Sequence, residues 1–144
     1  MTVISQQGTG VELPPIAENI FAYGDSGLPY LIGGYCASCA RHYFPMPEYC
    51  SHCQGAVEAV DLGRDGVIYS HTTIRTRPPY GLPRPYSVAM IDLASVRLRI
   101  FCLLDPAQAE DFSIGQKVTL AIGPMGHDAA ERPCLRPYFT SSQG

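Results

Sequence analysis

Four cysteines in two closely spaced pairs are the residues of this chain most able to do chemistry. Cys36 and Cys39 are two residues apart, and after ten further residues Cys50 and Cys53 repeat the spacing. Two such turns can bring four thiolates onto one tetrahedral ion, which predicts a zinc ribbon. Four sulfurs leave no coordination position open for water, so we expect a single structural metal that stabilises the fold and takes no part in catalysis.

Other uses of these cysteines stay open at this stage. Four thiolates can also hold iron, as in rubredoxin, and we treat iron as the less favoured metal. Two disulfides would suit a secreted domain, but the N-terminus MTVISQQGTG has no basic segment followed by an apolar one. We therefore expect a reducing cytoplasmic location, with free or oxidised thiols as the remaining alternative.

The basic residues are unusual in type and position. Nine of the ten are arginine, and five of these lie between residues 75 and 99, where Asp92 is the only acid. The forked guanidinium suits phosphate or carboxylate, although ordinary solvated strand residues explain the pattern equally well. A formal net charge of −3 gives no general attraction to nucleic acid or to an anionic membrane.

Short strands with proline and glycine turns are expected through most of the chain. Alternating or β-branched segments predict strands at 30–35, 57–62, 67–76, 86–93, 97–104, 117–122 and 135–140, with a further short strand between the two cysteine pairs. Residues 77–85 hold four prolines and cannot be strand interior. We expect one or two helical turns within 18–28, a short helix over 105–112 that is capped by Asp105, and a loop over 123–133.

This order of elements predicts a mainly β protein in which a zinc ribbon precedes a five-stranded barrel of the OB-fold type. The expected divisions are an N-terminal arm at 1–29, the ribbon at 30–60 and the barrel at 61–144. Two further cysteines are candidates of lower weight. Cys102 alternates with core leucines and should be buried, and Cys134 has no basic or histidine neighbour to activate it as a nucleophile. The motifs do not build a complete active site.

The sequence also resembles a known family. LIGGYCASCARHYFPMPEYCSHC, AVEAVDLGRDGVIYSHTTI, PYSVAMIDL and SIGQKVTL occur in the order typical of accessory proteins with a rubredoxin-like zinc ribbon and a C-terminal OB-fold. The resemblance covers residues 28–140, and its most specific parts are the cysteine pairs with Phe44-Pro45 between them, followed by Gly63 and Gly66. The N-terminal helical segment of many members is short here and rich in glycine and proline.

The resemblance implies a non-catalytic small subunit of a thiolase-type acyl-CoA enzyme, as in benzoylsuccinyl-CoA thiolase or steroid side-chain aldolase complexes. Such a subunit would stabilise its catalytic partner and shape the access of CoA in the breakdown of an aromatic, steroid or other acyl-CoA. The main alternative is a single-stranded nucleic-acid-binding protein, because OB barrels with exposed aromatic residues often have that role. The acidic pI of about 5.7 and the single lysine, Lys117, argue against it.

The proline-rich loop at 77–85 is the expected contact region. Arg75, Arg77 and Arg84 lie in or beside this loop, and Tyr80 adds an aromatic ring. These residues could clamp the nucleotide end of CoA at the joint with the partner, or they could form a rigid docking surface for the partner itself. We favour docking, because a rigid loop loses little entropy on association.

Overall fold

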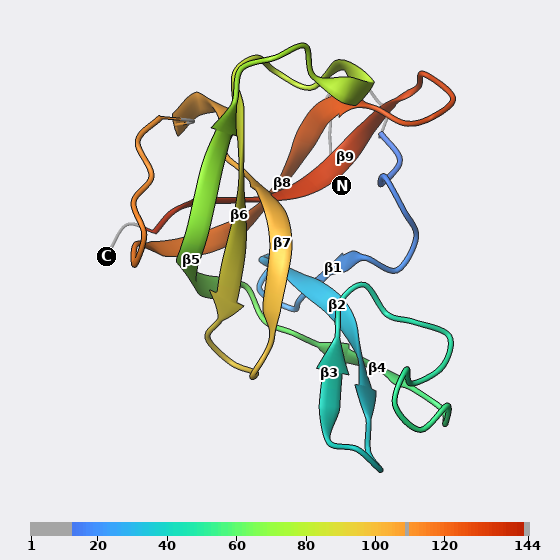
Figure 1. Ribbon diagram of the computed structural model, residues 1–144. Helices are drawn as coiled ribbons and strands as arrows, with labels where there is room; N and C mark the ends of the chain where they lie inside the picture. The colour runs from blue at the N-terminus through green and yellow to red at the C-terminus, as the bar shows by residue number, and fades with distance from the viewer. Residues whose placement is uncertain (1–12, 109, 143–144) are drawn as a thin grey trace.

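The computed structural model describes residues 13–108 and 110–142, which form two β-structures joined end to end (Figure 1). The smaller sheet contains β1 (Phe21–Tyr23), β2 (Pro29–Cys36), β3 (Arg41–Tyr43) and β4 (Glu58–Asp61). The larger one contains β5 (Asp65–Ile74), β6 (Tyr86–Leu93), β7 (Arg99–Leu104), β8 (Lys117–His127) and β9 (Pro133–Ser141). Within the described ranges, no helix is long and apolar enough to cross a membrane.

The five strands of the larger sheet form a closed barrel in the order β5-β6-β7-β9-β8. All neighbours are antiparallel except β7 and β9, which pair in parallel at Leu103 with Tyr138 and at Leu104 with Phe139. Closure leaves no exposed sheet edge, which is how small antiparallel barrels avoid edge-to-edge association. The predicted mainly β fold with a five-stranded barrel is confirmed.

Alternate residues of the barrel strands fill a single hydrophobic core. On β7, for example, Ile100, Cys102 and Leu104 are buried, whereas Arg99 and Phe101 are exposed. Leu31 from β2 and Leu62 after β4 belong to the same cluster and are fully buried. The smaller sheet is therefore anchored to the barrel through apolar contacts as well as through the chain.

Close packing between the two parts depends on a glycine in β2. A Cβ atom on Gly33 would collide with the backbone oxygen of Tyr43 and with the side chain of Leu62. Backbone bonds fix the same junction, since the Leu31 amide donates to the Gly63 carbonyl at 3.1 Å and the Leu62 amide donates to the Leu31 carbonyl at 2.9 Å.

The predicted helical turns within residues 18–28 are wrong. Residues 21–23 form β1, in which Phe21 pairs with Leu31 and Tyr23 pairs with Pro29. A glycine turn makes this hairpin possible, because Gly27 has a φ of 83° and its amide donates to the Gly24 carbonyl. Pairing with β2 thus overrides the weak local helical preference. Before β1, the Ile16 amide bonds to the Leu135 carbonyl on β9, and residues 1–12 of the expected arm lie outside the described residues.

The predicted helix at 105–112 is reduced to the 3₁₀ turn η3 (Pro106–Gln108). The expected cap is present, since the Ala107 amide donates to the Asp105 carboxylate at 2.9 Å. Residues 110–112 are not helical, and the buried side chain of Phe112 joins the barrel core. Burial of this ring, rather than local propensity, sets the path of the segment.

The predicted loop at 123–133 is also partly wrong. Strand β8 continues through the glycine-rich residues to His127, with an irregular register between Pro124 and His127. The pairing partners on β9 include Arg136 opposite Gly123 and Leu135 opposite Pro124. A proline can occupy this strand because the register breaks directly after it, and such bulges tolerate a missing amide donor.

Candidate metal centre and arginine sites

The four cysteines predicted as ligands come together at the tip of the smaller sheet. The sulfur atoms of Cys36, Cys39, Cys50 and Cys53 all lie within 4.8 Å of one another. The sulfurs of Cys36 and Cys53 are 3.6 Å apart, and those of Cys50 and Cys39 are 3.9 Å apart. Cys36 and Cys50 are buried, Cys39 is partly buried, and Cys53 is exposed. This geometry supports the predicted cluster.

Tight turns hold both cysteine pairs. Cys36 ends β2 and pairs with Arg41 at the start of β3, so the first pair lies in the connecting turn, where Ala40 has a φ of 54°. In the second turn, the Gln54 amide donates to the Cys50 carbonyl at 2.8 Å, and Gln54 has a φ of 63°. Amides of these turns also point at sulfur, from His52 to Cys50 and from Gly55 to Cys53, both at 3.4 Å. Such donors stabilise thiolate ligands.

The sulfurs differ strongly in acidity without a cation between them. The hydroxyl of Tyr43, 3.1 Å from the Cys50 sulfur, is the main cause that lowers the pKa of Cys50 to about 5. Burial, together with the neighbouring sulfurs, raises the pKa of Cys39 to about 12. One thiolate therefore forms readily, whereas four in this space require a cation to compensate their mutual repulsion.

The spacing of the cluster fits a tetrahedral metal. Zinc–sulfur bonds of about 2.3 Å place the corners of a regular tetrahedron roughly 3.8 Å apart, between the 3.6 Å and 3.9 Å separations given above. A disulfide needs sulfurs at about 2.05 Å, and all six cysteines are free. The disulfide alternative is therefore not supported, whereas these two separations and the gathering of all four sulfurs within 4.8 Å are compatible with a tetrahedral metal.

The loop at 77–85 lies at the end of the barrel away from the metal cluster (Figure 1). Its centre is the 3₁₀ turn η2 (Pro79–Gly81), as expected for a segment with four prolines. The exposed Tyr80 ring makes an edge contact with His127, with ring centroids 6.2 Å apart, and the guanidinium of Arg136 lies 5.6 Å from the Tyr80 centroid.

The three arginines predicted as contact residues near this loop make different contacts within the chain. Arg75 forms an ion pair with Glu110 at 2.7 Å, and Arg84 donates from Nε to the backbone carbonyl of Arg75 at 2.8 Å. Arg77 is exposed and has no ion-pair partner among the described residues. Among the described residues, Arg77 is thus the one of these three arginines left free to reach a ligand or a partner.

A second arginine-lined feature was not predicted from the sequence. A cleft of about 600 Å³ lies between the smaller sheet and the β6–β7 hairpin. Arg41 and His42 contribute from β3, and Ser95, Val96 and Arg97 contribute from the hairpin. Only Arg97 belongs to the arginine-rich segment noticed in the sequence. No local signal places Arg41 beside it, because the two residues meet through long-range packing.

The two remaining cysteines are part of the barrel. Cys102 is buried, and this burial raises the pKa of its thiol to about 12. Its expected role as a small hydrophobic residue is confirmed. Cys134 at the start of β9 has no exposed surface. Neither sulfur is presented to solvent as a nucleophile.

Comparison with known families matches both parts of the chain. Residues 28–58 match the model described as "ChsH2, rubredoxin-like zinc ribbon domain", and residues 59–122 match the model described as "ChsH2, C-terminal OB-fold domain". The two matches are contiguous and follow the order of the smaller sheet and the barrel.

Two known proteins are similar to the chain. The benzoylsuccinyl-CoA thiolase subunit BbsA of Geobacter metallireducens is 35% identical over 116 residues, which cover 80% of this chain and 77% of BbsA. A solved structure, the Ltp2-ChsH2(DUF35) aldolase, aligns with a TM-score of 0.60 and 24% identity over 78% of this chain and 84% of the other, and supports the fold. On these matches the chain belongs to the ChsH2 (DUF35) family, in which a rubredoxin-like zinc ribbon precedes an OB-fold domain.

Proposed function

We propose that this protein is a non-catalytic accessory subunit of a thiolase-type acyl-CoA enzyme. The observation that carries the proposal is its 35% identity to BbsA, a benzoylsuccinyl-CoA thiolase subunit, over most of both chains. The partner would supply the catalytic residues for thiolysis or a retro-aldol step. This subunit would stabilise the partner and shape the entry of CoA.

The chemistry of the described residues agrees with a non-catalytic role. Cys102 and Cys134 are buried, and a thiol with a pKa near 12 forms almost no thiolate at neutral pH. The other four cysteines lie together in the metal cluster. A closed four-sulfur shell offers no position for an activated water.

The metal is zinc in this proposal. Cys36, Cys39, Cys50 and Cys53 would hold one ion, which would supply structural cross-linking of the two turns. The chain would divide into an arm at 1–29, the zinc ribbon at 30–60 and the OB-fold domain at 61–144. We place the protein in the cytoplasm, where thiols stay reduced and can bind metal.

The loop at 77–85 is the proposed docking surface for the catalytic partner. Its prolines, the Tyr80–His127 contact and the bond from Arg84 to the Arg75 backbone hold it in one shape. A rigid surface is typical of interface contact regions when it carries an exposed aromatic ring and an arginine, here Arg77, that has no ion-pair partner among the described residues.

Co-purification tests the proposed function. The tagged chain is isolated from its native cell, and the proteins that accompany it are identified by mass spectrometry. A stoichiometric thiolase-family partner is expected, and activity toward an acyl-CoA should require both subunits. Isolation of the chain with nucleic acid or with no acyl-CoA enzyme would contradict the proposal.

Substitution of Cys134 checks that the chemistry resides in the partner. Cys134→Ala should leave the activity of the reconstituted complex within a few fold, because the sulfur is buried and takes no part in the reaction. A loss of about a thousandfold, the scale expected for a missing nucleophile, would place catalysis in this chain instead.

A further substitution tests the docking loop. Arg77→Ala combined with Arg84→Ala should weaken assembly, measured by sedimentation at dilute concentration, while the assembled enzyme keeps its KM for acyl-CoA. Lys117→Ala removes a positive charge outside the loop and serves as the control. An increased KM with intact assembly would show that the loop binds CoA, and no effect on either quantity would exclude both roles.

A further inference from the structure

The cleft between the ribbon and the barrel has the features of a ligand site. The ribbon contributes Tyr35 from β2 and residues 40–43 around the start of β3, and the barrel contributes residues 95–97. Arg41 at the start of β3 and Arg97 in the β6–β7 hairpin are both exposed, and both line the cleft. None of the described residues that line the cleft is a carboxylate, so a chain with a net charge of −3 carries a positive region here.

Most arginines in the described ranges are already engaged. Ion pairs hold Arg75, Arg99 and Arg132 to Glu110, Asp92 and Asp128. Three more arginines donate hydrogen bonds. Arg64 donates to the Thr119 hydroxyl and Arg84 to the Arg75 carbonyl, and Arg136 donates to the carbonyls of Met125 and His127. Only Arg41, Arg77 and Arg97 have no such contact within the described part of the chain, and two of these three face the same cleft.

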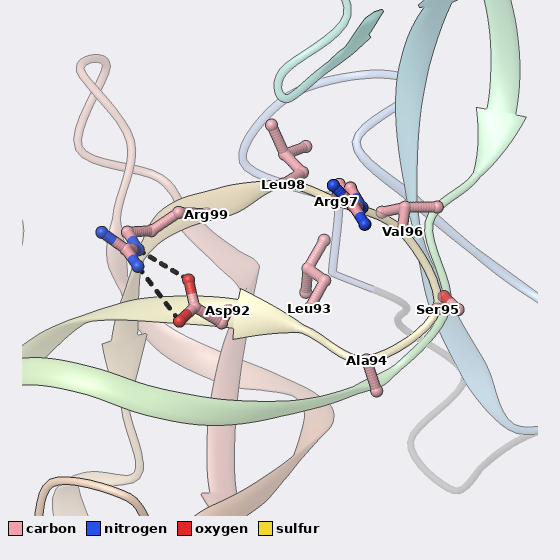
Figure 2. A pocket seen from close by; sticks show the side chains of 8 residues that line it. All are labelled: Asp92, Leu93, Ala94, Ser95, Val96, Arg97, Leu98 and Arg99. Carbon is pink, nitrogen blue, oxygen red and sulfur yellow. Dashed lines mark hydrogen bonds and ion pairs between the residues drawn. The ribbon is translucent and has the colours of Figure 1, made fainter. Parts of the chain in front are cut away.

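The barrel wall of the cleft is fixed by bonds within the hairpin and to the linker. The Ser95 hydroxyl donates to the Leu62 carbonyl at 2.9 Å, and the Ala94 amide donates to the Asp65 carbonyl at 2.9 Å. Val96 packs against the hydrophobic core. Figure 2 draws the hairpin residues 92–99, of which 95–97 line the cleft. Ser95 and Val96 lie beside the strands that lead into the ribbon, whereas Arg99 is bonded to Asp92 at the other end of the hairpin. The backbone that carries Arg97 is thus held in place before a ligand arrives.

The ribbon wall adds an aromatic surface next to the metal cluster. The rings of Tyr35 and His42 lie with centroids 4.7 Å apart and an interplanar angle of 44°. Tyr43, which also lines the cleft, contacts the Cys50 sulfur at 3.1 Å. Glu58 is opposite Tyr35 on β4 but does not line the cleft. Strand β3 therefore connects the side chains that line the cleft directly to the cysteine cluster.

We infer that this cleft binds a nucleoside phosphate, with Arg41 and Arg97 holding the phosphate from two sides and the Tyr35–His42 pair contacting the planar base. Guanidinium groups match phosphate oxygens in pairs, and bases stack on aromatic side chains. In the context of the proposed function, on which this identification of the ligand rests, the group would be the adenosine 3′-phosphate diphosphate end of CoA. The site is then separate from the docking loop, at the opposite end of the barrel.

Calorimetry with the full, metal-loaded chain tests the inference. Adenosine 3′,5′-bisphosphate and CoA should both bind, whereas adenosine and inorganic phosphate, which each offer half of the recognised features, should bind at least tenfold more weakly. Arg41→Gln and Arg97→Gln should each increase Kd by about tenfold, because each removes charge-assisted hydrogen bonds. Lys117→Gln removes the same charge outside the cleft and should leave Kd unchanged.

Other results would overturn the inference. The cleft is not a nucleotide site if the bisphosphate does not bind, or if Lys117→Gln weakens binding as much as the cleft variants do. It is a protein contact instead if Arg41→Gln and Arg97→Gln disrupt assembly with the partner and leave Kd unaltered. Bisphosphate binding that depends on Arg41 and Arg97 would support the cleft even if no acyl-CoA enzyme accompanies the chain, so this test and that of the proposed function can fail separately.

Discussion

The ribbon and the barrel are both β-structures, yet different forces hold them together. The barrel encloses a contiguous core, with Ile68, Ile91 and Phe139 almost or completely buried. In the ribbon, the buried positions of β2 to β4 are Leu31, two glycines and Cys36, and Leu31 belongs to the barrel core. Around the second cysteine turn, only Cys50 is buried.

This contrast follows from how much apolar surface each part can remove from water. A closed barrel buries alternate side chains of five strands, which gives it a hydrophobic driving force of its own. A small ribbon with short strands cannot build such a core, and small modules of this kind depend on a metal or another cross-link. The difference predicts that ribbon and barrel respond to different perturbations.

Removal of a metal ligand should have the largest effect, and it should be confined to the ribbon. Cys39→Ser removes one of the four sulfurs, and metal binding couples roughly 10 kcal/mol or more to the folding of such modules. We expect loss of bound metal and fast amide exchange over residues 36–58, with the barrel amides still protected. Elemental analysis and hydrogen exchange measure the two responses.

Cys134→Ala provides the matched control for this experiment. It removes a buried cysteine from the barrel and should leave the metal content at one ion per chain. Equal loss of protection in both parts after Cys39→Ser would mean that the barrel cannot fold without the ribbon, and the contrast between them would then be invalid.

A core truncation should produce the opposite pattern with a smaller effect. Phe139 is fully buried in the barrel, and Phe139→Ala should cost about 3–5 kcal/mol of unfolding free energy through lost burial and the cavity left behind. Denaturant unfolding measures the change. The metal should stay bound at denaturant concentrations where the barrel is still folded. Ile114→Ala changes a residue that is 70% exposed and should have little effect on the unfolding free energy.

The junction should show the smallest effect. Ser95→Ala removes the hydrogen bond to the Leu62 carbonyl, and we expect a loss of about 1 kcal/mol. Because this bond fixes the barrel wall of the cleft, hydrogen exchange should increase at residues 94–98 and at Leu62 without a change in the metal content. Ser113→Ala, at an exposed serine elsewhere on the barrel, is the control. Unchanged exchange at the hairpin would show that other contacts are sufficient to hold it.

Features of this chain that depend on residues near in sequence were predictable, whereas features that depend on distant residues were not. The cysteine cluster was predictable because each pair lies within one turn, and the spacing between pairs suits a short hairpin. The barrel strands were also predictable, since alternation along β7 and along the second half of β6 reflects burial on one face. The segments predicted wholly or partly wrongly, at 18–28, 105–112 and 123–133, are those where pairing or burial with distant residues overrides local preference.

The sequence by itself determined the four-cysteine cluster, the strand pattern of the barrel and the family, because these depend on spacing between near neighbours. Only the tertiary structure decided which arginines are free. Glu110 engages Arg75, and Asp92 engages Arg99, whereas Arg41 and Arg97 line one cleft and have no ion-pair partner among the described residues. The physical reason is that charge pairing acts through space, so the availability of a guanidinium depends on which distant side chains the fold brings to it.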